Sequence, residues 1–253
     1  MKRTSIYGLF RAFIVTCLLA LPTTVSANVV KLTSGEWQPY ISKSLKEGGF
    51  VTQLVKEAFE SQGYTVEFVY MPWKRSFEEA KSGLYDGSIV WSKTDEREEH
   101  FFYSHPIVVL KDAIFQRKDK PIRWSSRNDL TQYTIGGVLG YSYGLEDLES
   151  DNGWKIRRVS SPESNYQKLA AGRLDGVLED LNVGKQTINE MELGGQLEPA
   201  EQILSEREYH VIISKASPRA QELFEVLNKG LKQLVDEGKA DQYLEATLRG
   251  EYQ

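Results

Sequence analysis

The sequence contains a single cysteine and only three histidines in 253 residues. Cys17 lies in an N-terminal apolar segment that we expect to be removed, so the mature protein would have no disulfide and no reactive thiolate. The histidines, His100, His105 and His210, are dispersed and form no i,i+4 pair, which argues against a metal site. A serine-histidine-aspartate order, a phosphate-binding loop and a dinucleotide-binding glycine pattern are also missing from the sequence. We therefore expect no catalytic residue, no cofactor and no bound metal.

Long apolar runs are confined to the N-terminus. Two basic residues precede the apolar segment Ile6–Leu21, and the small residues Val25-Ser26-Ala27 follow it. Arg11 interrupts the segment, which is also short for a membrane-spanning helix. This pattern predicts a cleaved secretory signal peptide over residues 1–27.

The charge balance is acidic. The whole chain has a formal net charge of −5, and loss of residues 1–27 removes three positive and no negative charges, which leaves −8. Such a balance disfavours nucleic acid and anionic membrane surfaces as partners. We expect a soluble, exported protein.

The first half of the mature chain alternates strands and helices. Apolar residues follow strand periodicity in three segments and helical periodicity in two segments between them. Trp73 and Phe77 share one face of the second helical segment and are predicted to be core residues. In chain order, the predicted elements are strand 29–33, helix 50–59, strand 66–70, helix 73–80 and strand 88–91. A β-α-β-α-β order implies a mainly parallel sheet with helical crossovers.

The pattern then restarts. A glycine-flanked turn, Gly140–Gly144, follows a predicted strand at 133–138, and Ser161-Pro162 marks the start of a helix. Further strands are expected at 154–159, 176–180 and 202–214, and an amphipathic helix after Pro218. The chain therefore contains a second β-α-β block.

A short internal repeat supports two similar lobes. Ser82–Gly87 (SGLYDG) corresponds to Ala171–Gly176 (AGRLDG), and each segment lies between a predicted helix and an apolar strand. The blocks join through 107–116 and 209–214, so we expect lobe 1 to comprise 28–113 and 210–253, with lobe 2 (114–209) inserted. Two crossings between lobes form a hinge, and a cleft between hinged lobes is a common ligand site.

The segment Gly87–Arg97 is the clearest candidate for a binding site. Ser92, Thr94 and Arg97 follow a short apolar strand, and a guanidinium with two hydroxyls can bind a carboxylate. The local pattern alone favours another interpretation, in which the hydroxyls cap a helical turn and Arg97 pairs with a neighbouring glutamate, Glu96 or Glu98.

These residues also carry a resemblance to a known family. Ser92-x-Thr94-x-x-Arg97, followed by Phe102–Pro106, resembles the signature block of the extracellular solute-binding proteins of family 3, which serve amino-acid ABC transporters. Further similarity lies at Pro39-Tyr40, Asp129-Leu130, 172–176 and 227–243, and the resemblance extends over 29–248. It implies an α/β, two-lobed periplasmic-binding-protein-like fold, in which helices flank a mainly parallel sheet in each lobe.

The resemblance also implies roles for individual residues. Arg97, helped by Thr94 and Ser92, would bind the α-carboxylate of the ligand, and backbone N–H groups of Gly140-Tyr141-Ser142 would close on it from the other lobe. Asp180 would accept the α-ammonium group, although strand alternation leaves open whether Asp180 or Glu179 faces the cleft. The remaining expected ligand-binding residues are Trp37 and Tyr40, as walls of the pocket, and Trp91, which stands where the family usually has a small residue.

The resemblance implies a periplasmic, monomeric protein that captures an amino-acid-like solute for an inner-membrane ABC permease. Ser34 disfavours a basic ligand, because members that bind basic amino acids are expected to have an acidic residue there. Two alternatives remain open. One is a periplasmic cyclohexadienyl or arogenate dehydratase on the same fold, with Glu179 as the candidate general acid. The other is a ligand-sensing module for a separate receptor.

Overall fold

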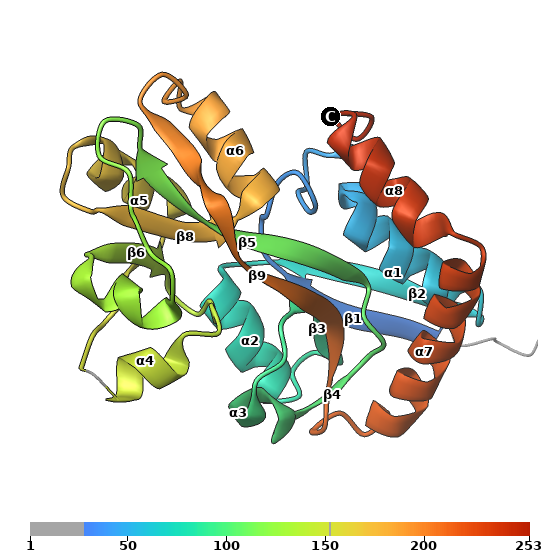
Figure 1. The fold of residues 1–253 in the computed structure, drawn as a ribbon. Coiled ribbons are helices and arrows are strands. Elements are labelled where there is room, and N and C mark those ends of the chain that lie inside the picture. Colours follow the sequence, from blue (N-terminus) through green and yellow to red (C-terminus); the bar gives the residue numbers. More distant parts are fainter. Residues whose placement is uncertain (1–27, 152) are drawn as a thin grey trace, which may run out of the picture.

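The computed structural model describes residues 28–151 and 153–253, so the predicted signal peptide lies outside the described residues. Within this part of the chain, strands form a nine-stranded mixed sheet in the order β2-β1-β3-β9-β5-β8-β6-β7, and β4 pairs with β9. Helices pack on both halves of this sheet (Figure 1). The alternation of strands and helices predicted from the sequence is therefore observed.

The strands have the following bounds: β1 Asn28–Ser34, β2 Tyr64–Tyr70, β3 Gly87–Trp91, β4 Phe101–Tyr103, β5 Val108–Arg117, β6 Ile135–Val138, β7 Arg157–Val159, β8 Gly176–Asp180 and β9 Leu197–Ser214. The α-helices are α1 Phe50–Glu60, α2 Trp73–Lys81, α3 Asp95–Glu98, α4 Glu146–Asp151, α5 Pro162–Ala170, α6 Leu181–Glu190, α7 Ala220–Asp236 and α8 Lys239–Leu248. Two short 3-10 helices, η1 Lys46–Gly48 and η2 Arg127–Gln132, complete the elements.

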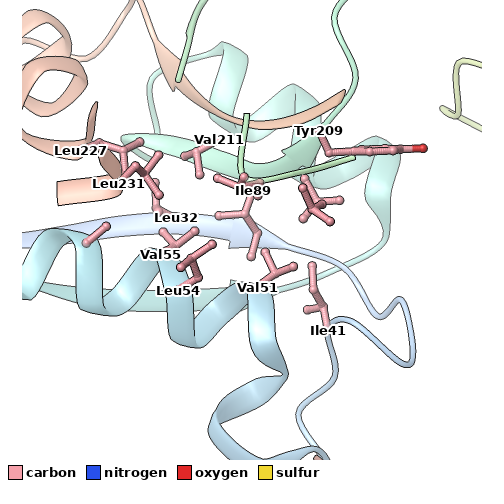
Figure 2. Close-up of a cluster of buried hydrophobic side chains, with 14 of the residues drawn as sticks. Leu32, Ile41, Val51, Leu54, Val55, Ile89, Tyr209, Val211, Leu227 and Leu231 are labelled. Atoms are coloured by element: carbon pink, nitrogen blue, oxygen red, sulfur yellow. The ribbon is translucent and has the colours of Figure 1, made fainter. Parts of the chain in front are cut away.

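The first half of the sheet, together with the helices packed on it, is built on three parallel strands. In it, β1 lies between β2 and β3. Its core forms where the apolar face of α1 meets β1, β3, β9 and α7 (Figure 2). Val51, Leu54 and Val55 of α1 are fully buried there, as the helical spacing of these residues predicts. Burial of each such side chain contributes roughly 1.5–3 kcal/mol, so this core holds the first half together.

The second half repeats this construction with β6 between β7 and β8, again in parallel. The helix α5 begins where the sequence predicts, because the Ser161 hydroxyl accepts a hydrogen bond from the Ser164 N–H and Pro162 occupies the first turn. Phe115 and Tyr166 pack edge to face in its core, with ring centroids 5.7 Å apart.

Two long antiparallel strands, β5 and β9, join the halves. The N-terminal part of β9 pairs with β5, whereas its C-terminal part pairs with β3 and β4 of the first half. β9 begins at Leu197, five residues before the predicted start at Gln202, because Leu197 and Ala200 are buried apolar residues that extend the ladder. The chain thus crosses between the halves at the two predicted segments, while the lobe boundaries 28–113, 114–209 and 210–253 remain a prediction.

The internal repeat corresponds to a repeated structural device. Asp86 accepts the Lys31 N–H through Oδ2 at 3.0 Å, and Asp175 accepts the Thr134 N–H through Oδ2 at 2.9 Å. In both places the aspartate precedes a strand and fastens it to a neighbouring parallel strand, at Lys31 within β1 and at Thr134 just before β6. The two halves therefore use the same turn chemistry to begin equivalent strands.

A bulge in β3 turns the chain toward the junction of the halves. Ser88 pairs with Ile212 and Trp91 with His210, so β3 has one residue more than β9 between these pairs. Val90 has φ +63°, a left-handed conformation that is strained for a β-branched residue. The bulge lies immediately before Ser92, where the candidate site begins.

Candidate functional site

A small cavity lies between the two halves. Its volume is about 40 Å³, enough for roughly three water molecules. The first half contributes Trp37, Trp73, Val90, Trp91, Ser92 and Arg97 to its lining. The second half contributes Gly140, Tyr141, Ser142, Tyr143, Glu179 and Asp180. The long connecting strands add Asp112, Arg207 and Tyr209.

Arg97 supplies a cation to this cavity. Its guanidinium donates to the Ser92 carbonyl at 2.9 Å and hydroxyl at 3.2 Å, and to the Gly140 carbonyl at 3.1 Å. It also lies over the Trp91 ring, 4.9 Å from the centroid. Burial is the main effect on its pKa and lowers it, and among the described residues no carboxylate forms an ion pair with it. Arg97 is thus a partly buried cation held by neutral oxygens and an aromatic ring.

Ser92 and Thr94 have different positions. Ser92 is buried, lines the cavity and binds Arg97, whereas Thr94 does not line the cavity. The Thr94 hydroxyl instead accepts the Arg97 N–H at 3.3 Å and caps the N-terminus of α3. The Thr94 hydroxyl therefore has the capping role that the local sequence pattern favours, and its expected contact with a ligand carboxylate is left to be tested by substitution. The alternative pairing of Arg97 with Glu96 or Glu98 is not observed in the described structure.

The carbonyl groups of the Gly140–Ser142 turn accept hydrogen bonds from Arg97 and Arg207. Gly140 has φ +84°, which glycine adopts readily, and its carbonyl faces the Arg97 guanidinium. The Ser142 carbonyl accepts a hydrogen bond from Arg207. The turn contacts the first half through the Gly140 carbonyl, and the expected role of its backbone N–H groups at a ligand stays a prediction.

Aromatic side chains form much of the cavity wall. The Trp73 ring meets Trp91 edge to face, with centroids 5.6 Å apart, and Tyr141 at 6.4 Å. On another part of the wall, the ring centroids of Trp37 and Tyr209 lie 5.3 Å apart. Trp73, predicted to be a core residue, packs partly buried against the core and also lines the cavity, because it begins α2 and meets Trp91 at the end of β3. Aromatic walls of this kind can contact an apolar or planar part of a ligand whose polar groups bind elsewhere in the cavity.

Tyr40 connects the two halves from behind the wall. It is completely buried and does not line the cavity, which differs from its expected role. Its hydroxyl donates to Asp180 Oδ1 at 2.9 Å and accepts from the Asn182 amide at 2.9 Å. Since Asp180 Oδ1 also accepts the Asn182 and Val183 N–H groups, Asp180 caps α6 and holds Tyr40 at once.

Glu179 and Asp180 both line the cavity, because the chain leaves β8 and turns into α6 at this point. Glu179 Oε1 accepts the Trp37 indole N–H at 3.4 Å and the Asp180 N–H at 3.0 Å. Within the described structure, Glu179 Oε2 and Asp180 Oδ2 are buried without a hydrogen-bond partner. Burial, the largest effect, raises the pKa of Glu179 to about 8 and that of Asp180 to about 6.

A second guanidinium is already neutralised. Arg207 on β9 forms a bidentate ion pair with Asp112 on β5, and its Nη2 also donates to the Tyr209 hydroxyl at 3.0 Å. Asp112 is only 2% exposed. This buried pair fixes the junction of the long strands, and it leaves Arg97 as the cation without a carboxylate partner among the described cavity residues.

Sequence reasoning missed Asp112, Tyr143, Arg207 and Tyr209. Arg207 and Tyr209 lie two residues apart on β9, so strand alternation could have placed them on one face. Asp112 pairs in register with Asp180, and only the strand order reveals this relation. Tyr143 belongs to the predicted glycine-flanked turn, where its hydroxyl accepts the Val138 N–H at 2.8 Å.

A family model for bacterial extracellular solute-binding proteins, family 3, matches residues 30–248. The chain belongs to this family, as the sequence motifs indicated. No curated protein matches the sequence significantly. Among the described residues, no helix combines the length and apolar character needed to cross a bilayer.

Solved structures confirm the α/β periplasmic-binding-protein-like fold. A histidine kinase sensor domain with similarity to periplasmic binding proteins superposes with a TM-score of 0.75 at 23% identity, over 88% of this chain and 96% of that one. The amino acid ABC transporter substrate-binding protein AbpA from Streptococcus pneumoniae, bound to L-arginine, gives 0.70 at 22% identity over 89% and 97%. The GluR0 ligand-binding core from Nostoc punctiforme, in complex with L-glutamate, gives 0.69 at 22% identity over 85% and 96%.

Proposed function

We propose that this protein captures a small amino-acid-like solute in the periplasm, between its two halves, and delivers it to an ABC permease of the inner membrane. The observation that carries the proposal is the charge arrangement of the cavity. Arg97 faces it without a carboxylate partner in the described structure, while Glu179 and Asp180 supply buried carboxyl oxygens without donors.

A zwitterion complements both ends of such a site. Its carboxylate accepts hydrogen bonds from the Arg97 fork, and its ammonium group donates to the acidic pair. Each hydrogen bond to a charged group is worth roughly 1.5–3 kcal/mol, so three of them account for micromolar affinity, about −8 kcal/mol. The aromatic walls then contact the ligand side chain.

The test is a thermal-shift screen of the purified protein after removal of bound solute by unfolding and refolding. The screen covers the twenty amino acids, dipeptides, polyamines and prephenate, with calorimetry on each hit. A ligand that binds only the folded state raises the unfolding midpoint by mass action. We expect a selective shift with one amino acid or a small group of them, and a screen without any amino-acid shift would refute the proposal.

Delivery is tested separately from capture. Deletion of the gene is expected to abolish high-affinity uptake of the hit solute by cells. Unchanged uptake together with tight binding would favour the sensing alternative, since a histidine kinase sensor domain shares this fold.

Glu179 supports a second candidate function. A buried carboxyl that stays protonated near neutral pH and lines a cavity has the properties of a general acid, as a dehydratase requires. Steady turnover of prephenate or arogenate, lost on Glu179→Gln, would establish this activity. Binding without turnover would exclude both substrates.

A further inference from the structure

Three residues with hydroxyl groups form a buried network in the core of the first half. Ser76 Oγ lies 2.8 Å from Thr33 Oγ1 and 2.9 Å from Ser88 Oγ, and all three residues are fully buried. The Ser88 hydroxyl also donates to the Thr33 carbonyl at 3.0 Å. Buried hydroxyls are tolerated in a core only where their hydrogen bonds are made. The network ends on Trp91, whose indole N–H donates to Ser88 Oγ at 2.7 Å.

The backbone beside Trp91 is unfavourable as well. Val90 precedes Trp91 with φ +63°, a left-handed conformation that β-branched residues rarely adopt. Strain of this kind persists only where the surrounding structure enforces it, and such positions gather at binding sites. The buried hydroxyls and the strained residue therefore both act on the orientation of one side chain, that of Trp91.

The Trp91 ring is packed on several sides. Its centroid lies 5.3 Å from that of Phe77 and 5.6 Å from that of Trp73. The guanidinium carbon of Arg97 lies over the ring, 4.9 Å from the centroid. Trp91 lines the cavity, yet it is only 5% exposed. Because turning the ring aside would break its hydrogen bond to Ser88 and its contact with Arg97, Trp91 is a fixed wall of the cavity.

The space that this wall leaves is small. The cavity of about 40 Å³ holds roughly three water molecules, each with a share of about 30 Å³ of liquid volume. Covalently bonded atoms lie closer together than neighbouring waters, so the same space accommodates the five non-hydrogen atoms of glycine and little more. A longer or branched side chain would need to displace Trp91 or hold the two halves apart.

We propose that Trp91 is a specificity-determining residue that limits the ligand to the smallest amino acids (glycine, alanine and serine), and that Ser88 is the positioning residue that holds it. This limit rests on the proposed function and deepens it. It concerns the side chain of the ligand and not its charged ends, so it can fail while capture of an amino acid stands.

The first experiment uses the wild-type protein, freed of bound solute by unfolding and refolding. Calorimetry measures its affinity for glycine, alanine, serine, valine, leucine and phenylalanine. Each methylene without room in a pocket weakens binding roughly tenfold or more, so leucine should bind at least about a hundredfold more weakly than alanine. A wild-type protein that binds leucine as tightly as alanine overturns the size limit.

The second experiment changes the wall. Trp91→Leu opens space beside the cavity, so the affinity for leucine relative to alanine should rise at least about tenfold. Phe101→Leu is the matched control, because Phe101 is a buried member of the same apolar cluster but does not line the cavity. Its affinity ratio should equal that of wild type. The ratio is taken within one variant, so a general loss of stability does not move it.

An equal loss of affinity for leucine and alanine in Trp91→Leu would make Trp91 a structural residue only and overturn its assignment. Trp91→Phe, which keeps a ring in the cluster and removes the indole N–H, supplies the same comparison if Trp91→Leu does not fold. The wild-type series decides the size limit in either case.

The third experiment tests the positioning role of Ser88. Ser88→Ala removes the acceptor of the indole N–H, whereas Ser76→Ala weakens the same network without removing that acceptor. We expect the leucine-to-alanine affinity ratio to rise severalfold in Ser88→Ala and to stay near the wild-type value in Ser76→Ala. The same ratio in both variants would refute the positioning role.

The outcomes separate the size limit from the proposed function. A wild-type protein that binds leucine or a larger amino acid most tightly refutes the size limit and leaves capture of an amino acid intact. A screen in which no amino acid binds refutes both.

Discussion

Replacing Arg97 with methionine should abolish ligand binding while leaving the fold at least as stable. Methionine retains an unbranched apolar side chain against Trp91 but removes the charge and all donors. The structure makes this a sharp test because Arg97 binds only neutral oxygens and aromatic rings among the described residues.

The expected loss of binding follows from the hydrogen bonds of the guanidinium fork. Two charge-assisted bonds to a carboxylate contribute roughly 1.5–3 kcal/mol each. Loss of about 3 kcal/mol weakens affinity by more than a hundredfold, since each 1.4 kcal/mol is a factor of ten. A micromolar ligand would then bind too weakly for calorimetry to detect at ordinary concentrations.

The expected effect on stability is small or positive. Burial lowers the pKa of Arg97, which shows that the surroundings disfavour its charge. The variant loses hydrogen bonds to Ser92 and Gly140, but it also relieves the desolvation of a partly buried cation. Binding sites commonly sacrifice stability in this way.

The assay combines chemical denaturation without ligand and calorimetry with the screened amino acid. Arg75→Met on α2 is the matched control, because this exposed arginine pairs only with Glu79 in the described structure and should affect neither measurement. Wild-type affinity in Arg97→Met would refute the assignment of Arg97. A large loss of stability would instead show that Arg97 is a structural residue.

Three further changes test other parts of the site. Tyr40→Phe removes the hydroxyl that joins Asp180 to the first half but keeps the buried ring. Ligand affinity measured by calorimetry should fall about tenfold, in line with a net loss of about 1–2 kcal/mol for its two buried hydrogen bonds, to Asp180 and from Asn182; unchanged affinity would show that ligand binding does not need these contacts. Thr94→Ala removes the cap of α3 and should lower the free energy of unfolding by about 1 kcal/mol with almost no change in ligand affinity. A large loss of affinity would show that Thr94 binds the ligand. Glu179→Gln should flatten the pH dependence of stability: the pKa of Glu179 is raised to about 8, so the native state keeps a proton that the unfolded chain loses near 4.5, and wild-type stability should fall by up to about 1.4 kcal/mol per pH unit between these values. If the free energy of unfolding changed with pH in the same way in wild type and variant across this range, the raised pKa of Glu179 would be contradicted.

Local patterns predicted the regular elements well where short-range chemistry determines them. β8 has the predicted bounds Gly176–Asp180, and α5 begins at the predicted proline because capping and proline geometry act within one turn. The start of β9 was placed too late, since Glu198, Pro199 and Glu201 interrupt the apolar pattern of a segment that forms its ladder with β5. Strand pairing over such distances depends on the fold as a whole.

The site was predictable only in part, for the same reason. The resemblance to the family identified Arg97 and Trp37, which line the cavity, whereas Thr94, which it also assigned to the ligand, caps α3 outside the cavity lining. Asp112 and Arg207 come from strands that the sequence marked only as crossings. Their pairing requires knowledge of the register between β5 and β9.

The position of β9 in the sheet determines the order in which this chain can fold. β9 lies between β3 and β5, yet it is the last strand of the sequence. During synthesis from the N-terminus, β1, β2 and β3 are therefore complete long before β9, the partner of β3, exists. The open edge of β3 is exposed to wrong pairing until the chain has been made as far as Ser214. The half that is synthesised first is completed last, so protection from wrong strand pairing matters most for the N-terminal strands.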